Sequence, residues 1–363
     1  MSTFPQYGAQ YAAQRGAVHC TIVPPYLLAR LAELQDPAHQ VAAAAARRAL
    51  VQLDPIHSAR AEAPSDSPRR PGTAVVLALR RTIADAGGSE SLPGKTVRRE
   101  GDTPTGDAAV DEAYDGLGAT YALFDEEYGR SSMDDAGLPL DATVHYGDRY
   151  DNAFWDGTRM VFGDGDGEIF GRFTASLTVI GHELAHGFTQ YTSNLRYQGQ
   201  SGALNESISD VFGVLVEQRL LGQSADEASW LVGEGIFTGQ VEGRALRSLK
   251  APGTAYDDDV LGKDPQPATM ADYVETTSDN GGVHINSGIP NHAFYIAATR
   301  LGGNAWEAAG QIWYDTATGG QVPVDCDFAQ FAQVTVDAAR RRFGDGSAEV
   351  EAVRYAWKEV GVL

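Results

Sequence analysis

The sequence predicts an α+β chain of two lobes, the first mixed and the second mainly helical. Short alternating segments typical of strands occur at residues 73–79 and 142–146, with one helical segment at residues 107–128 between them. Beyond Thr174 the strand patterns nearly vanish. Helical periodicity dominates there, over residues 204–221, 292–301, 305–316, 326–343 and 348–360.

Composition divides the chain into four stretches. Residues 1–60 combine a polar lead with an alanine-rich helical run at residues 36–53, and residues 61–72 concentrate proline, serine and glycine. Such a segment disfavours regular structure and is open to proteolysis, so we expect a linker and processing region there. The first lobe then covers residues 73–190 and the helical lobe covers residues 191–363.

The charge balance limits the partners. Lys and Arg number 28 against 49 Asp and Glu, and the formal net charge of −21 repels nucleic acid and anionic membranes.

Residues 1–17 are polar, with no apolar signal region, and no stretch of about 18 apolar residues occurs. Cys20 and Cys326 provide neither a disulfide framework nor a cysteine-based zinc cluster. We expect a monomer made in the cytoplasm, with no nucleic-acid partner, no membrane span and any export by a nonclassical route.

A metal-binding pattern occupies residues 182–186, which read His-Glu-Leu-Ala-His in a helix predicted from near Thr178 to about Gly187. Two histidines four apart project from one face of a helix, so both imidazoles can reach one ion while the glutamate faces the open coordination position. Taken alone, the pattern is as often a solvated surface helix. A carboxylate motif at residues 205–210, nineteen residues after the second histidine, argues against a chance match.

A single catalytic zinc ion needs a third protein ligand. Glu206 supplies it, because two histidines and one glutamate leave the fourth position open. Asp210 lies one helical turn further and is expected to accept the distal N–H of His182, as Asn205 could for His186. Since the histidine helix joins the two lobes, the zinc site is expected in the cleft between them.

Ordered motifs extend over nearly the whole chain. They are Asn-Ala-Phe-Trp at 152–155, Met-Val-Phe-Gly-Asp-Gly at 160–165, residues 182–186, Tyr-Gln at 197–198, Ser-Gly-Ala at 201–203, residues 205–210, Ala-Leu-Arg-Ser at 245–248, and residues 279–288. With them the sequence resembles the thermolysin-like M4 metallopeptidases, specifically their protealysin-like branch. The resemblance implies a thermolysin-like fold and a zinc endopeptidase acting on peptides or proteins.

The alternative is a catalytically silent peptide-binding module. An aminopeptidase is a nearer rival, but no acidic clamp for a free amine is evident.

By this resemblance, Glu183 is the general base that takes a proton from the zinc-activated water. Zinc chemistry supports this role independently, because the metal lowers the pKa of its water and a neighbouring carboxylate then needs to move only one proton. The resemblance also implies that His284, oriented by Asp279, and Tyr197 stabilise the developing oxyanion. Taken alone, His284 reads as a turn histidine and Tyr197 as a core aromatic.

The resemblance places substrate on an edge strand and in an apolar pocket. Asn152, Ala153 and Trp155 match the strand on which peptide docks by strand addition, and Arg247 matches the group that holds a substrate carbonyl. The pocket for the residue after the cleaved bond (S1′) matches five apolar residues, which implies cleavage before Leu, Phe, Ile or Val: Phe170, Phe173, Val179, Val232 and Leu246. A plain core cluster is the alternative for these five.

The sequence departs from the family pattern at the double-calcium site. Many relatives hold two calcium ions near the zinc helix, and Glu217 and Glu234 stand at two of the ligand positions. Thr178, Ser229 and Leu231 occupy three others and leave too few oxygens for calcium. We predict that the double-calcium site is absent.

Residues 1–60 resemble the short propeptide of the protealysin-like branch, which implies a zymogen inhibited by its own amino-terminal segment. The stiff segment Pro24, Pro25, Tyr26 and Leu27 is expected to occupy the cleft uncut. Cys20 could reach the zinc as a thiolate, although a small buried hydrophobe is the more ordinary reading. We expect processing within residues 50–70, and the resemblance leaves room for a proteinaceous inhibitor as a further partner.

Overall fold

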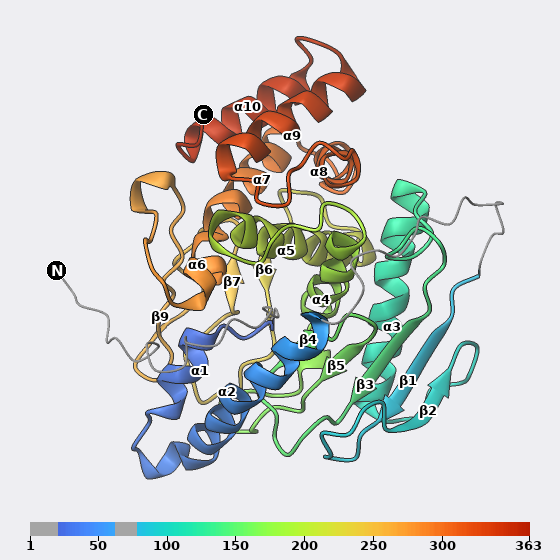
Figure 1. Ribbon diagram of the computed structural model, residues 1–363, viewed down its shortest axis with the longest axis vertical. Coiled ribbons are helices and arrows are strands. Elements are labelled where there is room, and N and C mark those ends of the chain that lie inside the picture. Colours follow the sequence, from blue (N-terminus) through green and yellow to red (C-terminus); the bar gives the residue numbers. More distant parts are fainter. Residues whose placement is uncertain (1–20, 62–77) are drawn as a thin grey trace.

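The computed structural model describes residues 21–61 and 78–363. Cys20 and residues 73–77 therefore lie outside the described residues. The predicted two-lobed α+β class is confirmed, with a sheet-containing lobe at one end and a stack of helices at the other (Figure 1). Across the described ranges, no helix combines the length and the apolar content needed to cross a membrane.

A five-stranded mixed sheet forms the first lobe. Its order is β2-β1-β3-β5-β4, with β3 parallel to both β1 and β5 and the two edge strands antiparallel to their neighbours. The strands are β1 (Arg81–Asp85), β2 (Lys95–Arg99), β3 (Leu140–Val144), β4 (Ala153–Trp155) and β5 (Met160–Phe162). Because β4 pairs only with β5, one backbone edge of β4 is available to another chain segment.

Two helices of this lobe follow the predicted periodicity. Helix α3 (Ala108–Ala122) starts at Asp107, whose carboxylate caps the first turn, and continues as a π-helical turn to Glu127. Helix α4 (Leu177–Gln190) carries the histidine pattern and contacts α3, β4 and the second lobe. It lies near the middle of the molecule in Figure 1.

Helices dominate the second lobe. They are α5 (Gly199–Leu221), α6 (Asp279–Asn286), α7 (Gly288–Leu301), α8 (Ala308–Thr318), α9 (Phe328–Phe343) and α10 (Ala348–Glu359). Four two-residue strands also occur, β6 (Leu231–Val232), β7 (Arg247–Ser248), β8 (Asp257–Asp258) and β9 (Gly262–Lys263). Helix α5 is buried almost along its whole length because the other helices surround it.

The amino-terminal segment packs onto both lobes. It contains α1 (Pro25–Ala32), a short turn (Pro37–His39) and α2 (Gln40–Ala61), which ends one residue beyond the predicted propeptide boundary. Ile22, Leu28 and other apolar residues of this segment are fully buried and belong to the same core cluster as the catalytic lobes. The segment is therefore an integral part of this form of the protein.

Candidate metal centre and active site

Two glycines let α4 and α5 cross closely enough to share one site. A Cβ at Gly181 would lie 3.0 Å from the Cα of Gly213, and a Cβ at Gly213 would lie 2.7 Å from the carbonyl oxygen of Thr178 and 3.1 Å from the backbone nitrogen of His182. Any side chain at either position would push the helices apart. The crossing brings the histidines of α4 against the carboxylates of α5.

The three residues predicted as zinc ligands meet at this crossing. The Nε2 atoms of His182 and His186 are 3.0 Å apart, and carboxylate oxygens of Glu206 lie 3.6 and 3.7 Å from them. All three side chains are buried, and their ligand atoms lie within 4.8 Å of one another. Ligands of a tetrahedral zinc ion, each about 2.1 Å from the metal, are separated by about 3.4 Å. The donor set and its spacing therefore fit zinc.

The distal nitrogens of both histidines have partners on α5. His182 Nδ1 lies 2.7 Å from Asp210 Oδ1, and His186 Nδ1 lies 2.9 Å from Asn205 Oδ1 and 3.0 Å from Ser209 Oγ. Because the Asp210 and Asn205 oxygens only accept hydrogen bonds, each Nδ1 carries the proton and each Nε2 presents its lone pair to the metal position. Ser209 was missed by sequence reasoning, although its place one turn after Asn205 was a usable signal.

Asp210 also connects the histidine to Arg247. The guanidinium donates from Nη2 to Oδ1 and from Nε to Oδ2, both at 2.9 Å, and both side chains are fully buried. Burial raises the pKa of Asp210, but Arg247 and then His182 outweigh it and hold this pKa well below its usual range. Asp210 is therefore an anion that orients one predicted ligand and one predicted substrate-binding residue together.

Glu183 lies on the same helix and reaches toward the edge strand. The backbone N–H of Trp155 donates to Glu183 Oε2 at 3.0 Å, and the indole N–H of Trp155 donates to Gln190 Oε1 at 3.2 Å. These bonds hold the predicted base beside both the metal position and β4. A carboxylate in this place can accept a proton from a water molecule that attacks a peptide docked on β4.

His284 and Asp279 form a buried pair at the start of α6. Asp279 accepts from His284 Nδ1 at 2.6 Å and from its backbone N–H at 2.9 Å. Residues 279–282 have positive φ angles, and this turn lets Asp279 fold back onto the histidine. Burial lowers the pKa of His284, but Asp279 and then Glu206 outweigh it and raise the pKa to about 9. Tyr197 Oη lies 3.3 Å from His284 Nε2 and donates to Glu206 Oε1 at 2.5 Å.

The amino-terminal segment adds to the edge of β4. The N–H of Ile22 donates to the carbonyl of Ala153 at 3.1 Å. The Asn152 side chain makes two hydrogen bonds with the backbone of Val23. It accepts from the Val23 N–H at 2.9 Å and donates to the Val23 carbonyl at 3.3 Å. These residues of the edge-strand surface thus hold a peptide backbone in the structure.

The same segment reaches the other predicted groups. The carbonyl of Ile22 accepts from Arg247 Nη1 at 3.1 Å, and the carbonyl of Thr21 accepts from His284 Nε2 at 3.1 Å. These contacts come from the residues immediately before the segment predicted to occupy the cleft, residues 24–27. Pro24 and Pro25 instead begin α1, with Pro24 as its N-cap and Pro25 as its first residue.

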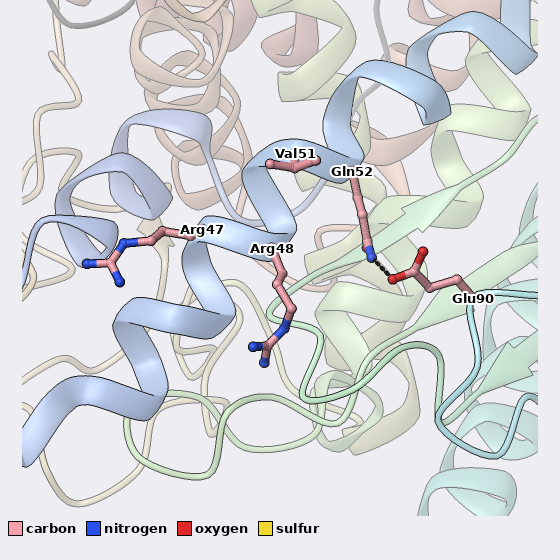
Figure 2. Close-up of a pocket in the computed structure, with 5 residues that line it drawn as sticks. All are labelled: Arg47, Arg48, Val51, Gln52 and Glu90. Carbon is pink, nitrogen blue, oxygen red and sulfur yellow. Dashed lines mark hydrogen bonds between the residues drawn. The ribbon is translucent and has the colours of Figure 1, made fainter.

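The five predicted S1′ residues are all buried. The rings of Phe170 and Phe173 are 5.6 Å apart, and the backbone N–H of Leu246 donates to the carbonyl of Val232 at 2.9 Å. A surface hollow elsewhere, lined by residues of α2 and by Glu90, contains none of the predicted site residues (Figure 2). At the predicted site itself, residues 21–23 of the amino-terminal segment contact Ala153, Asn152, Arg247 and His284.

This fold and this site define a metal-dependent hydrolase. Residues 73–190 match the family described as "Thermolysin metallopeptidase, catalytic domain", and residues 193–362 match "Thermolysin metallopeptidase, alpha-helical domain". The chain is 49% identical to an "Extracellular metalloprotease" of Pectobacterium carotovorum subsp. carotovorum over 344 residues, covering 94% of this chain and 96% of that protein. It is 54% identical to "Protease PrtS" of Photorhabdus sp. (strain Az29) over 287 residues, covering 78% and 76%.

A solved structure is similar throughout. The precursor of protealysin, a metalloproteinase from Serratia proteamaculans, superposes with a TM-score of 0.85 at 51% identity, covering 95% of this chain and 100% of that chain. The chain belongs to the thermolysin family of metallopeptidases. It is a metalloendopeptidase of thermolysin type, and the family implies zinc as its metal. The catalytically silent alternative finds no support.

Proposed function

We propose that this chain is a zymogen of a zinc endopeptidase that cleaves before bulky hydrophobic residues. In this proposal the zinc ligands are His182, His186 and Glu206. The observation that carries the proposal is the set of backbone hydrogen bonds that residues 21–23 make with Ala153 of β4, Asn152, Arg247 and His284. The precursor form of the similar protealysin structure supports the same reading.

A zinc ion held by these ligands would supply a Lewis acid that polarises the substrate carbonyl and acidifies water. The chain's own residues provide the rest of the chemistry. Glu183, fixed by the Trp155 amide, takes the proton of the attacking water and delivers it to the leaving nitrogen. His284 and Tyr197 donate to the oxygen on which negative charge develops. Both His284 nitrogens have acceptors in this structure, so the ring is held as an imidazolium ready for that role.

The contacts assign a register to the bound segment. Thr21 presents its carbonyl to His284 and occupies the position before a cleaved bond, while Ile22 occupies the position after it (P1′). Arg247 holds the Ile22 carbonyl and Asn152 holds Val23, as a substrate backbone would be held. The Ile22 side chain is fully buried, which supports an S1′ preference for aliphatic and aromatic residues.

Contacts beyond the cleft support inhibition by the propeptide. Arg30 of α1 donates to the carbonyls of Asp259 and Val260 at 2.7 and 2.8 Å. The N–H of Ala42, in the first turn of α2, donates to the Glu168 carboxylate at 3.0 Å, which is a favourable place for a negative charge. Because the segment is covalently attached, its effective concentration at the cleft is high. Modest contacts are therefore enough to keep it bound. Its removal within residues 50–70 would then open the site.

The proposal is tested with an internally quenched peptide blocked at its amino terminus. Processed enzyme should hydrolyse it, phenanthroline should abolish the reaction, and Glu183→Ala should bind zinc without turnover. Hydrolysis of a blocked peptide also separates this activity from that of an aminopeptidase. Amino-terminal sequencing of the active form should find a start within residues 50–70, and full activity with residue 1 intact would refute the zymogen. A peptide library that favours charged P1′ residues would refute the specificity.

We also propose that no pair of calcium ions binds beside the zinc helix. The Thr178 hydroxyl, at one of the ligand positions, already accepts from the N–H of Gly233 at 2.9 Å. Glu217 and Glu234 are the only carboxylates among the five matched ligand positions, since Ser229 and Leu231 also lack one. Calorimetric titration that detects two tight calcium ions would contradict this. The extracellular name of the Pectobacterium relative supports action outside the cell, by a route that remains to be tested.

A further inference from the structure

Asp210 receives a fourth hydrogen bond, from a residue outside every motif that predicted the site. Asn291 lies in the first turns of α7 and is fully buried. Its Nδ2 donates to Asp210 Oδ2 at 2.8 Å, the oxygen that also accepts from Arg247 Nε. The other Asp210 oxygen accepts from His182 and Arg247 Nη2. One carboxylate thus receives donors from α4, β7 and α7.

Only the donating half of the Asn291 amide is used. Its Oδ1 is buried and has no hydrogen-bond partner among residues 21–61 and 78–363. Leaving a buried acceptor unsatisfied is costly, so a residue selected only for stability would be expected to use both ends of its amide or to be apolar. The amide is therefore placed for its contact with Asp210.

We propose that Asn291 is a positioning residue that fixes the Asp210 carboxylate and, through it, the ring of His182. The inference rests on the proposed role of His182 as a zinc ligand. Without Asn291, Oδ2 would be held only by Arg247, which also binds the peptide carbonyl at Ile22. With Asn291 in place, the carboxylate keeps a donor on Oδ2 that does not contact substrate. The zinc ligand is thereby shielded from movements of the substrate-binding arginine.

The neutral amide suits this task better than the other donors available to a protein. A lysine or arginine would add a second positive charge beside Asp210 and weaken its pull on the His182 N–H. An aspartate would bring two buried carboxylates together. Asparagine supplies a donor without altering the net charge of the group that supports the metal ligand.

The experiment compares the parent with Asn291→Leu, which keeps the branched shape but removes the donor. Zinc affinity is measured by competition with a chromophoric chelator on processed enzyme, beside kcat and KM for the blocked peptide. We expect zinc affinity to fall about tenfold, the lower range seen for groups that support metal ligands, with kcat reduced and KM nearly unchanged. If the leucine variant does not fold, Asn291→Ser replaces it, because its hydroxyl is too short to reach Asp210.

Two controls make the outcome specific. Thr335→Val removes a buried hydroxyl of α9 that accepts from Trp357 and donates to Ala332. It should lower the melting temperature of the apo protein without changing zinc affinity. In an Asp210→Asn background, adding Asn291→Leu should cost little further zinc affinity, because both act through one group.

The possible failures are distinguishable. A parent that binds zinc no better than His182→Ala overturns the proposed zinc site itself. Suppose that the parent binds zinc tightly and that Asp210→Asn binds it more weakly. A zinc affinity of Asn291→Leu within twofold of the parent would then overturn the role of Asn291. Equal losses from Asn291→Leu in the wild-type and Asp210→Asn backgrounds would also overturn it, since they would show a general effect on stability.

Discussion

Truncating Ile22 should weaken the latency of the precursor by a calculable amount. Its side chain is fully buried and is assigned to the S1′ pocket in the proposed register, and its carbonyl is held by Arg247. Replacing a buried isoleucine with alanine costs about 2–5 kcal/mol. Since 1.4 kcal/mol corresponds to a factor of ten, even the lower limit of about 2 kcal/mol raises the ratio of open to closed precursor about 30-fold. Initial activity of unprocessed Ile22→Ala should rise by the same factor.

The assay is the initial rate on the quenched peptide, divided by the rate of the same sample after complete processing. Mass spectrometry must show that the precursor is intact during the measurement. The processed enzyme lacks residue 22, so its rate should be identical for all variants and serves as an internal standard. Gln35→Ala is the control, because Gln35 is exposed, lies well before the predicted processing region and donates to Glu33 of the same segment. A leak rate for Ile22→Ala within twofold of the parent would refute the reasoning.

Three further predictions concern other groups. Arg30→Ala should raise the same leak rate less than Ile22→Ala does, by about 5-fold, because two hydrogen bonds at this exposed position contribute about 0.5 kcal/mol each. His284→Ala should lower kcat by about 10²–10³-fold with zinc content unchanged in elemental analysis; a parallel loss of zinc would contradict its role at the oxyanion. Asp151 is fully buried, and burial followed by the neighbouring Asp166 carboxylate raises its pKa well above the usual range. The folded parent therefore keeps a proton that the unfolded chain releases above about pH 4, and its stability falls as pH rises from there. Asp151→Asn should raise the melting temperature at pH 7.5 and leave it unchanged near pH 3.5; an equal shift at both values would reject the titration argument.

Long periodic elements were predictable from the sequence. The helical patterns located α7, α8, α9 and α10 to within a few residues, because each helix buries one face and repeats its apolar residues every three or four positions. The short strands β6 to β9 have two residues each and cannot display any period. The strand predicted at residues 73–79 lies mainly outside the described residues. Strand β1 (Arg81–Asp85) was not predicted, and it pairs with the largely polar β2, which has no clean alternation to read.

The site was predictable where its residues stand in local patterns. Helical spacing puts His182 and His186 on one face of α4, and the carboxylate motif that contains Glu206 is also visible in the sequence. Asn291 was missed because a single asparagine in a helix gives no sign of a partner 81 positions earlier. The contacts of Thr21 and Ile22 could not be placed either, since a linear segment does not reveal which of its residues will reach a distant cleft.

The glycine crossing of α4 and α5 has a consequence for movement. Because backbone meets backbone at Gly181 and Gly213, the two helices cannot slide or tilt without a steric clash. The histidines and the glutamate on them consequently travel as one rigid unit. The geometry of the metal centre is therefore set by this helix pair and not by the loops around it.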